Sequence, residues 1–320
     1  NGYERDFAER CFKQIEGFAD YGFPESHAAS FALLVYASSW LKCHYPAAFT
    51  CALLNSQPMG FYAPAQIVRD AQEHGVVLRP VDVNRSDWDC TLEPGPATEP
   101  ALRLGFRQVK GLKEEDMQRL VLHRGNGYGD PAAIMRRAAV SRSVLEKLAR
   151  ADAFQSMNLD RRPALWAVKR LSDAPPAPLF AMGGGNGGRA GDLSAEPPED
   201  APPPLLPLMS PGEEVADDYR SLRLSLKAHP AEILRPKLAA RGYHPCATAE
   251  TLAHGKRIRI AGLVTARQRP GTAKGVIFLT VEDETATANL IVWPHVFEAF
   301  RRPVLGSRLL GVTGEVQRAG

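Results

Sequence analysis

The chain has 320 residues, with 39 lysines and arginines against 36 aspartates and glutamates and 44% hydrophobic residues. This composition excludes a wholly disordered chain, and the length predicts two or three domains. The net charge of +3 averages unlike regions: residues 1–100 carry −6, 101–173 carry +7, 174–254 carry −3 and 255–320 carry +5. Two basic regions suggest contact with a polyanion at two places, although ordinary solvated surface gives the same pattern.

Membrane and disulfide-rich classes do not fit this sequence. The apolar run 28–41 is interrupted by serines and is shorter than the ~20 residues that span a bilayer. No basic-then-apolar leader is present. Cysteines are odd in number and form no C-x-x-C pair: Cys11, Cys43, Cys51, Cys90 and Cys246. This pattern disfavours a disulfide scaffold or zinc ribbon and predicts a reducing, cytoplasmic location.

Residues 3–56 show the apolar spacing of helices. One helix carries Phe7 and Ile15, and a second follows Pro24 with Ser26 as its cap. Pro46 starts a third helix that runs to about Leu54. A fourth is expected over 65–74, followed by a short strand at 76–78 and extended chain over 82–92. We expect four large side chains in the core of this region: Phe31, Leu34, Trp40 and Tyr45.

Residues 101–155 predict a strand and then two helix–turn–helix units. The first turn is 109–112, followed by a helix over about 113–123. The second unit has its helix at 143–150 and ends near Asp152. Residues 174–212 contain 10 prolines and 7 glycines, which is typical of a flexible linker. A helical region of about 213–241 follows.

Residues 256–320 switch to the alternation of strands. Strands are expected near 257–265, 275–281, 286–293 and 309–312, with a short helix over 294–300. The acidic turn 282–284 is interpreted as a solubility feature. Three strands, a helix and a strand match the order of an OB-fold, a small Greek-key barrel, without its fifth strand.

At this point the residues resemble a known family. Residues 20–62 (DYGFPESHAASFALLVYASSWLKCHYPAAFTCALLNSQPMGFY) are similar to the fingers end of bacterial C-family DNA polymerases. That family includes the alpha subunit of replicative DNA polymerase III and its error-prone paralogue. Three details resemble the error-prone branch: Pro24-Glu25 before Ser26-His27, residues 55–62 (NSQPMGFY), and residues 269–275 (RPGTAKG) with Val292-Trp293-Pro294.

The resemblance covers nearly the whole chain and implies a multidomain α+β protein. Its implied parts are a fingers end (1–100), a tandem helix-hairpin-helix (101–173), a flexible linker (174–212), a helical connector (213–255) and a truncated OB-fold (256–320). Because the chain begins at Asn1 and stops at Gly320 after a strand, we expect an internal piece, from the C-terminal half, of a longer polypeptide.

The resemblance also implies a function, namely DNA-directed synthesis across damage as part of the DNA damage response. Its substrates would be primer-template DNA and deoxynucleoside triphosphates. In this family, palm carboxylates hold two divalent metal ions, Mg²⁺, for phosphoryl transfer. No matching acidic cluster is present, so we expect no catalytic residue, metal or other cofactor in this chain, which alone should be inactive. Two alternatives stay open: a replicative alpha subunit, and a non-enzymatic DNA-binding scaffold.

Candidate DNA contacts fall in the two basic regions. Helix-hairpin-helix turns bind the DNA backbone through helix N-terminal amides, with glycine allowing close approach. We therefore expect Arg107, Lys110, Gly111 and Lys113 to contact duplex DNA. Lys113 and Asp152 replace glycines of the family pattern, and Asp152 should repel phosphate, so the second hairpin is expected to be mainly structural.

In the barrel, basic residues beside aromatic ones are typical of single-strand binding. The candidates are Arg257, Arg259, Arg267, Arg269 and Lys274. Strand context places Phe278 and Trp293 in the core more readily than on a binding face.

Other candidates are weaker. Ser26, His27 and Lys42 could contact a nucleotide or template, but capping and snorkelling explain them better. Leu179-Phe180 resembles the end of a sliding-clamp peptide without its leading glutamine. The resemblance also implies an accessory mutagenesis protein as another route to the clamp.

Overall fold

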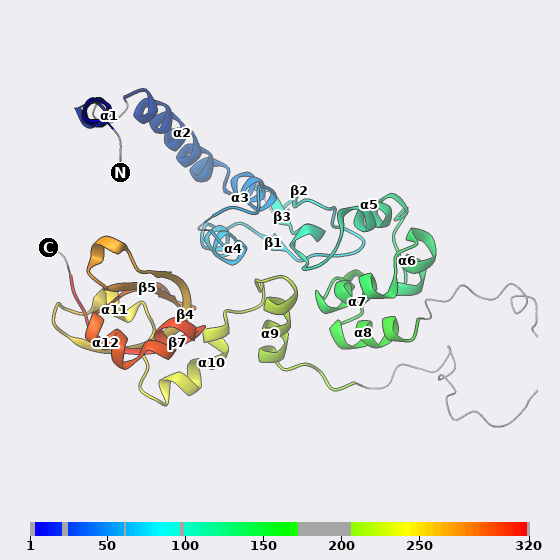
Figure 1. Ribbon diagram of the computed structural model, residues 1–320. Coiled ribbons are helices and arrows are strands. Elements are labelled where there is room, and N and C mark those ends of the chain that lie inside the picture. Colours follow the sequence, from blue (N-terminus) through cyan, green and yellow to red (C-terminus); the bar gives the residue numbers. More distant parts are fainter. Residues whose placement is uncertain (1–3, 21–24, 61, 97–98, 172–205, 319–320) are drawn as a thin grey trace, which may run out of the picture. The chain divides into compact units, whose positions relative to one another are not determined.

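The computed structural model describes residues 4–20, 25–60, 62–96, 99–171 and 206–318, except for the side chains of 14–20 and 25–27. The chain divides into two compact units. The first comprises 1–79 with 90–103, and the second comprises 80–89 with 104–320. Figure 1 labels their helices and strands.

In the part that the structure describes, the first unit has four helices and a small sheet. The helices are α1 (Arg5–Asp20), α2 (Glu25–His44), α3 (Pro46–Asn55) and α4 (Pro64–Glu73). The sheet has the order β1-β3-β2, in which β1 (Leu78–Arg79) is parallel and β2 (Thr91–Glu93) antiparallel to β3 (Ala101–Arg103). The predicted third and fourth helices are confirmed. The extended chain predicted over 82–92 is wrong for most of its length, because only the last residues form a strand.

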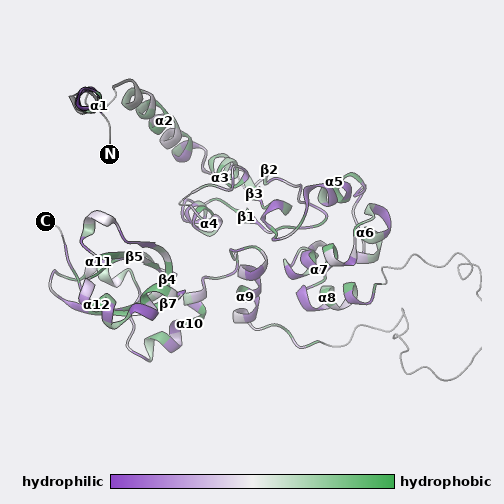
Figure 2. Ribbon diagram, in the orientation of Figure 1, coloured by the Kyte–Doolittle hydropathy of each residue, from purple (hydrophilic) through white to green (hydrophobic). Residues whose placement is uncertain are grey.

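The core predicted for α2 is also wrong. Phe31, Leu34, Trp40 and Tyr45 are all exposed. The physical reason is that α2 is apolar on every side, and most of it lacks hydrophilic colour in Figure 2. A helix that is apolar all round needs partners on every face to be buried. Its packing within this unit is chiefly against α3, which covers only part of its circumference.

The second unit begins with short helices that form the two hairpins. These are η1 (Phe106–Gln108), α5 (Glu114–Leu122), α6 (Pro131–Ala138), α7 (Arg142–Arg150), η2 (Gln155–Met157) and α8 (Arg161–Lys169). Amphipathic spacing buries one face of each α-helix in this region. The largest fully buried side chains include Phe106, Leu120, Leu145, Leu148 and Phe154. The helices predicted at the two turns are therefore confirmed, with boundaries shifted by a few residues.

Helices α9 (Pro211–Ser221), α10 (Pro230–Ala239) and α11 (Thr248–Thr251) follow. The next element is a curled antiparallel sheet of order β6-β5-β4-β7 (Figure 1). Its strands are β4 (Arg257–Gln268), β5 (Ile277–Glu282), β6 (Thr287–Val292) and β7 (Leu309–Glu315). A short helix η3 (Gly271–Ala273) precedes β5, and α12 (Pro294–Ala299) and α13 (Arg301–Gly306) precede β7. The sheet is a half-barrel consistent with the predicted incomplete OB-fold.

The acidic turn at 282–284 holds the barrel to the helix before it, so its interpretation as a solubility feature is wrong. Asp283 is fully buried and accepts hydrogen bonds from the backbone amides of Cys246, Thr285 and Ala286. Arg235 of α10 donates to Asp283 at 2.7 Å and also pairs with Glu284. One buried carboxylate therefore connects α10, the segment before α11 and the β5–β6 turn.

The surroundings of Asp283 set its charge state. Burial alone would raise the pKa of Asp283, but the hydrogen bonds from Thr285, Cys246 and Ala286 outweigh burial and hold it below its ordinary value. The thiol of Cys246 responds in the opposite sense, because burial and the neighbouring Asp283 carboxylate raise its pKa to about 12. Asp283 is thus ionised and Cys246 is a neutral thiol at neutral pH.

We predict that Asp283→Ala destabilises the barrel by about 3–5 kcal/mol, because it leaves Arg235 and three amides without their acceptor. Glu284→Ala is the matched control and should cost less, since Glu284 accepts from fewer groups. Hydrogen exchange of the β5 and β6 amides measures both effects. Equal losses in the two variants would contradict the central role of Asp283.

The same carboxylate gives a pH dependence. Folding lowers the pKa of Asp283, so the ionised carboxylate stabilises the folded barrel. This stabilisation is fully present at pH values above the ordinary pKa of an aspartate, and it is lost as the pH falls through the pKa of Asp283 in the folded chain. Barrel stability should therefore fall as the pH drops below about 4, and Asp283→Asn should flatten that decline.

Candidate nucleic-acid interface

The first hairpin turn presents its backbone as the sequence predicts. Gly111 adopts a φ of +80°, a left-handed conformation that favours glycine. Lys113 is the N-cap residue of α5, and both Lys110 and Lys113 are exposed. Among the described residues, no acceptor lies within hydrogen-bonding distance of the amides of Gly111, Lys113 and Glu114. A helix N-terminus with such amides is suited to an anion such as a DNA phosphate.

Two features of this turn were not predicted. The amide of Lys110 donates to the carbonyl of Ser221 at 2.8 Å, so the end of α9 supports the turn from behind. Lys147 of α7 donates from Nζ to the Gly111 carbonyl at 2.7 Å. It therefore adds a third lysine to the turn. Lys147 lies 36 residues from Gly111 in sequence, so only the tertiary fold shows the contact.

At the second hairpin, Asp152 occupies the left-handed position with a φ of +61°. Its carboxylate is 12% exposed and pairs at 2.9 Å with Lys227, which lies between α9 and α10. Lys227 also pairs with Glu214. Burial lowers the pKa of Lys227, but its bonds to Glu214 and Asp152 outweigh burial and raise it above the ordinary value. The lysine is thus charged at neutral pH and offsets the acid that we expected to repel phosphate.

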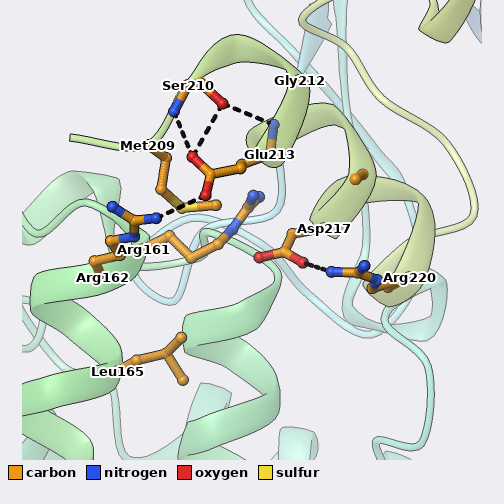
Figure 3. A pocket seen from close by; sticks show the side chains of 10 residues that line it. Arg161, Arg162, Leu165, Met209, Ser210, Gly212, Glu213, Asp217 and Arg220 are labelled. Atoms are coloured by element: carbon orange, nitrogen blue, oxygen red, sulfur yellow. Dashed lines mark hydrogen bonds and ion pairs between the residues drawn. The ribbon is translucent and has the colours of Figure 1, made fainter. Parts of the chain in front are cut away.

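A buried ion pair joins α8 to α9. Arg161 donates to Asp218 and, at 3.0 Å, to the carbonyl of Glu214, and both charged side chains are almost fully buried. Ser225 donates to the second oxygen of Asp218 at 2.7 Å. Beside this pair lies an open cleft of about 540 Å³ (Figure 3). Arg162 pairs there with Glu213, which closes a capping box with Ser210 at the start of α9.

Most arginines of the hairpin region are neutralised internally. Those that pair with carboxylates are Arg103, Arg107, Arg119, Arg124, Arg142, Arg161 and Arg162. Arg137 donates to three backbone carbonyls and lies over the Tyr128 ring. The predicted contact Arg107 is thus held by Asp89 at 2.5 Å. Pairing within the fold therefore reduces the number of arginines in this region that can contact a ligand.

The predicted barrel cations do not form one groove. Arg267 donates to the carbonyls of Val304 and Ser307 and so fastens β4 to the end of α13. Arg269 lies over the Phe297 ring at 5.2 Å, near the far end of β4. Lys274, in the same β4–β5 connection, is exposed. Arg257 and Arg259 lie at the opposite end of the strand, paired in register with β7.

Phe278 and Trp293 are not core residues, contrary to the expectation from strand context. They are 39% and 48% exposed, respectively. Phe278 is opposite Ile291 in the β5–β6 register, and Ile291 is also exposed. Alternation explains the exposure, because the neighbours Ile277 and Leu279 take the inward positions. The three exposed side chains Phe278, Ile291 and Trp293, called here the stacking platform, lie on one face of the sheet.

The structure adds no support for the weaker candidate contacts in the first unit and the linker. Lys42 pairs with Asp70 at 2.8 Å, both side chains being about 40% exposed. Ser26 and His27 lie within α2, but their side chains fall outside the described residues, as do Leu179 and Phe180.

Two further properties concern the described part of the chain alone. No group of three His, Cys, Asp or Glu side chains there could hold a metal ion, so we assign no Mg²⁺ chemistry to these residues. None of the helices described has the length and apolarity needed to cross a membrane.

Comparison with known protein families matches two parts of the chain. A helix-hairpin-helix family model matches residues 75–164, and an OB-fold nucleic-acid-binding model matches residues 258–320.

The whole chain is similar to error-prone DNA polymerases, as the sequence predicts. It is 57% identical over 320 residues to that of Ruegeria pomeroyi, 52% over 318 residues to that of Brucella abortus, and 53% over 338 residues to error-prone DNA polymerase 1 of Rhizobium meliloti. At least 99% of the chain is covered in each case, but it spans only 28–29% of the length of these relatives.

We predict that Lys227 stabilises the second hairpin through Asp152. Lys227→Met should lower the free energy of unfolding by roughly 1 kcal/mol or less, because the ion pair is partly exposed to solvent. In an Asp152→Gly background, the same substitution should lower it by clearly less. Glycine tolerates the left-handed backbone and carries no charge, so the partner of Lys227 at this position is absent. Urea denaturation of the four proteins measures the coupling. Equal costs in both backgrounds would contradict the prediction.

Proposed function

We propose that the chain is the DNA-holding part of an error-prone DNA polymerase that copies damaged templates. Similarity to such polymerases over the full chain is the observation that carries the proposal. In this proposal, the whole protein is a DNA-directed DNA polymerase that uses primer-template DNA, deoxynucleoside triphosphates and Mg²⁺. The chain itself supplies DNA contacts and part of the fingers.

The proposed division of labour follows the two nucleic-acid-binding folds. Residues 101–173 would hold duplex DNA, chiefly through Lys110, Gly111 and Lys113 with Lys147 beside them. Residues 256–320 would hold the single-stranded template through the stacking platform and the adjacent cations Arg269 and Lys274. Residues 1–100 would complete the fingers, and 174–255 would connect the modules. Contact with a sliding clamp, through Leu179-Phe180 or an accessory protein, remains part of this proposal.

A non-enzymatic DNA-binding scaffold is the alternative from another class. It shares both modules but not the polymerase activity, so DNA binding alone does not separate the two. The polymerase activity of the full-length protein on a primed template distinguishes the two alternatives. Extension past a damaged base supports the polymerase, and DNA binding without extension supports the scaffold.

We predict that Lys110→Glu/Lys113→Glu weakens binding of the chain to duplex DNA. Each lost phosphate contact should flatten the plot of log affinity against log salt by about 0.9. Fluorescence anisotropy over a range of salt concentrations measures both quantities. The control is Arg10→Glu/Lys13→Glu on α1, which changes the net charge equally. An unchanged slope in the hairpin variant would contradict duplex contact at the first turn.

We predict that Phe278→Ala and Trp293→Ala each weaken binding to single-stranded oligothymidine by about 1–3 kcal/mol, with little change in the salt dependence. Aromatic side chains contribute by stacking on bases rather than by charge. An abasic strand should bind the wild-type chain and both variants alike. If the variants bind oligothymidine as tightly as the wild type, the platform does not stack bases.

A further inference from the structure

Arg259 of β4 is held in one orientation by an aromatic ring. Its guanidinium carbon lies 4.6 Å from the centre of the Tyr243 ring. The same ring packs against β7, since a Cβ at Gly311 would lie 2.7 Å from the Tyr243 hydroxyl. Tyr243 therefore fills a space that only glycine leaves open. A stacked guanidinium loses less rotamer freedom when it binds a ligand than a free one does.

Two more arginines belong to the backbone segments that form this stack. Arg257 precedes Arg259 by two residues on the same face of β4, because Ile258 and Ile260 between and beyond them point into the core. Arg241 adjoins Gly242, whose Cβ position is 3.6 Å from Nη1 of Arg259. Glu315 faces Arg257 in the β4–β7 register but forms no ion pair with it. Among the described residues, none of the three arginines pairs with a carboxylate. This contrasts with the hairpin region.

The stack is remote from the stacking platform. Phe278 is opposite Gln268 in the β4–β5 register, and Gln268 is nine residues from Arg259. At about 3.3 Å per residue, this is about 30 Å along the strand. The two ends of β4 thus differ: one end has the exposed stacking platform with Arg269 and Lys274 nearby, and the other has the Arg259–Tyr243 stack beside Arg257.

We propose that Arg259, oriented by Tyr243 and joined by Arg257 and Arg241, is a phosphate-binding site for the backbone of single-stranded DNA, separate from the stacking platform. A planar guanidinium with its ring-facing side occupied presents its N–H edge outward, where it can bind a phosphate through two hydrogen bonds. The proposal rests on the proposed DNA-binding function of the barrel. Tyr243 is a positioning residue in this site, and Arg259 is the contacting one.

The experiment uses the full chain with a 25-nucleotide oligothymidine and a 25-base-pair duplex, titrated at several salt concentrations. Arg257→Gln/Arg259→Gln should reduce the steepness of the salt plot for the single strand by about 0.7 per lost contact. The control Arg10→Gln/Lys13→Gln has the same net charge, and the slope of its salt plot should equal that of the wild type. A reduction seen only with the duplex would identify duplex phosphate as the ligand instead and overturn the proposed single-strand path.

Tyr243 variants test the positioning role without changing charge. Tyr243→Phe keeps the ring and should bind like the wild type. Tyr243→Leu should weaken single-strand binding by about two- to fivefold in a chain whose thermal melt is intact. If Tyr243→Leu strongly lowers the melting temperature, Arg259→Lys is the test instead. This variant keeps the positive charge but removes the planar group that stacks on Tyr243. If Arg259→Lys and the wild type then bind the single strand equally well, the proposal is overturned.

The outcomes separate this proposal from the function on which it rests. If Phe278→Ala weakens single-strand binding while the arginine and tyrosine variants do not, the platform stands and the phosphate site is wrong. If none of the variants changes binding, the proposed DNA-binding role of the barrel fails as well.

Discussion

The buried pair of Arg161 and Asp218 is the interaction on which the hairpin region depends. It joins helices that lie on either side of the proline- and glycine-rich segment 174–212, so chain far apart in sequence becomes one packed module. Charges this deeply buried are costly unless each is paired and hydrogen-bonded, and Glu214 and Ser225 supply the additional bonds. With α9 fixed in this way, its last carbonyl supports the first hairpin turn. The residues that follow α9 place Lys227 at the second hairpin, where it pairs with Asp152.

The region predicted as a helical connector is therefore divided between two modules. Helix α9 belongs by its contacts to the hairpins, whereas α10 is held to the barrel through Arg235 and Asp283. Each attachment includes a charged pair with additional hydrogen bonds, beside buried apolar side chains such as Val215 and Ala231. Such pairs fix geometry more than they add net stability.

The net charge of a region predicts its contacts with DNA only when the ion-pair partners of its basic side chains are known. The sequence predicts DNA contacts in both basic regions, and the hairpin region has the larger net charge, yet most of its arginines are bound internally. The barrel, with a smaller net charge, leaves Arg257, Arg259 and Arg269 without carboxylate partners among the described residues. Net charge does not count the cations that a polyanion can contact, because ion pairs within the fold decide which of them are available.

Element order, the Gly111 turn and the strand–helix–strand pattern of the barrel were predictable, because each depends on local spacing and on residues with strong backbone preferences. The exposure of Phe278 and Trp293 was not, since period-two alternation does not say which face is inward. Asp283 looked like a surface acid because its partners, Arg235 and Cys246, lie 37 or more residues away in sequence. Lys147 and Lys227 were missed for the same reason.

The central claim is that the hairpins hold duplex DNA while the barrel holds a single strand. Photo-cross-linking of the full chain to a primer-template with 5-iodouracil at defined positions tests this claim directly. We expect iodouracil in the single-stranded overhang to cross-link to Phe278 or Trp293, and iodouracil in the duplex to cross-link near Lys113. Overhang cross-links that map to the first hairpin, with duplex cross-links on β5 and β6, would contradict the account.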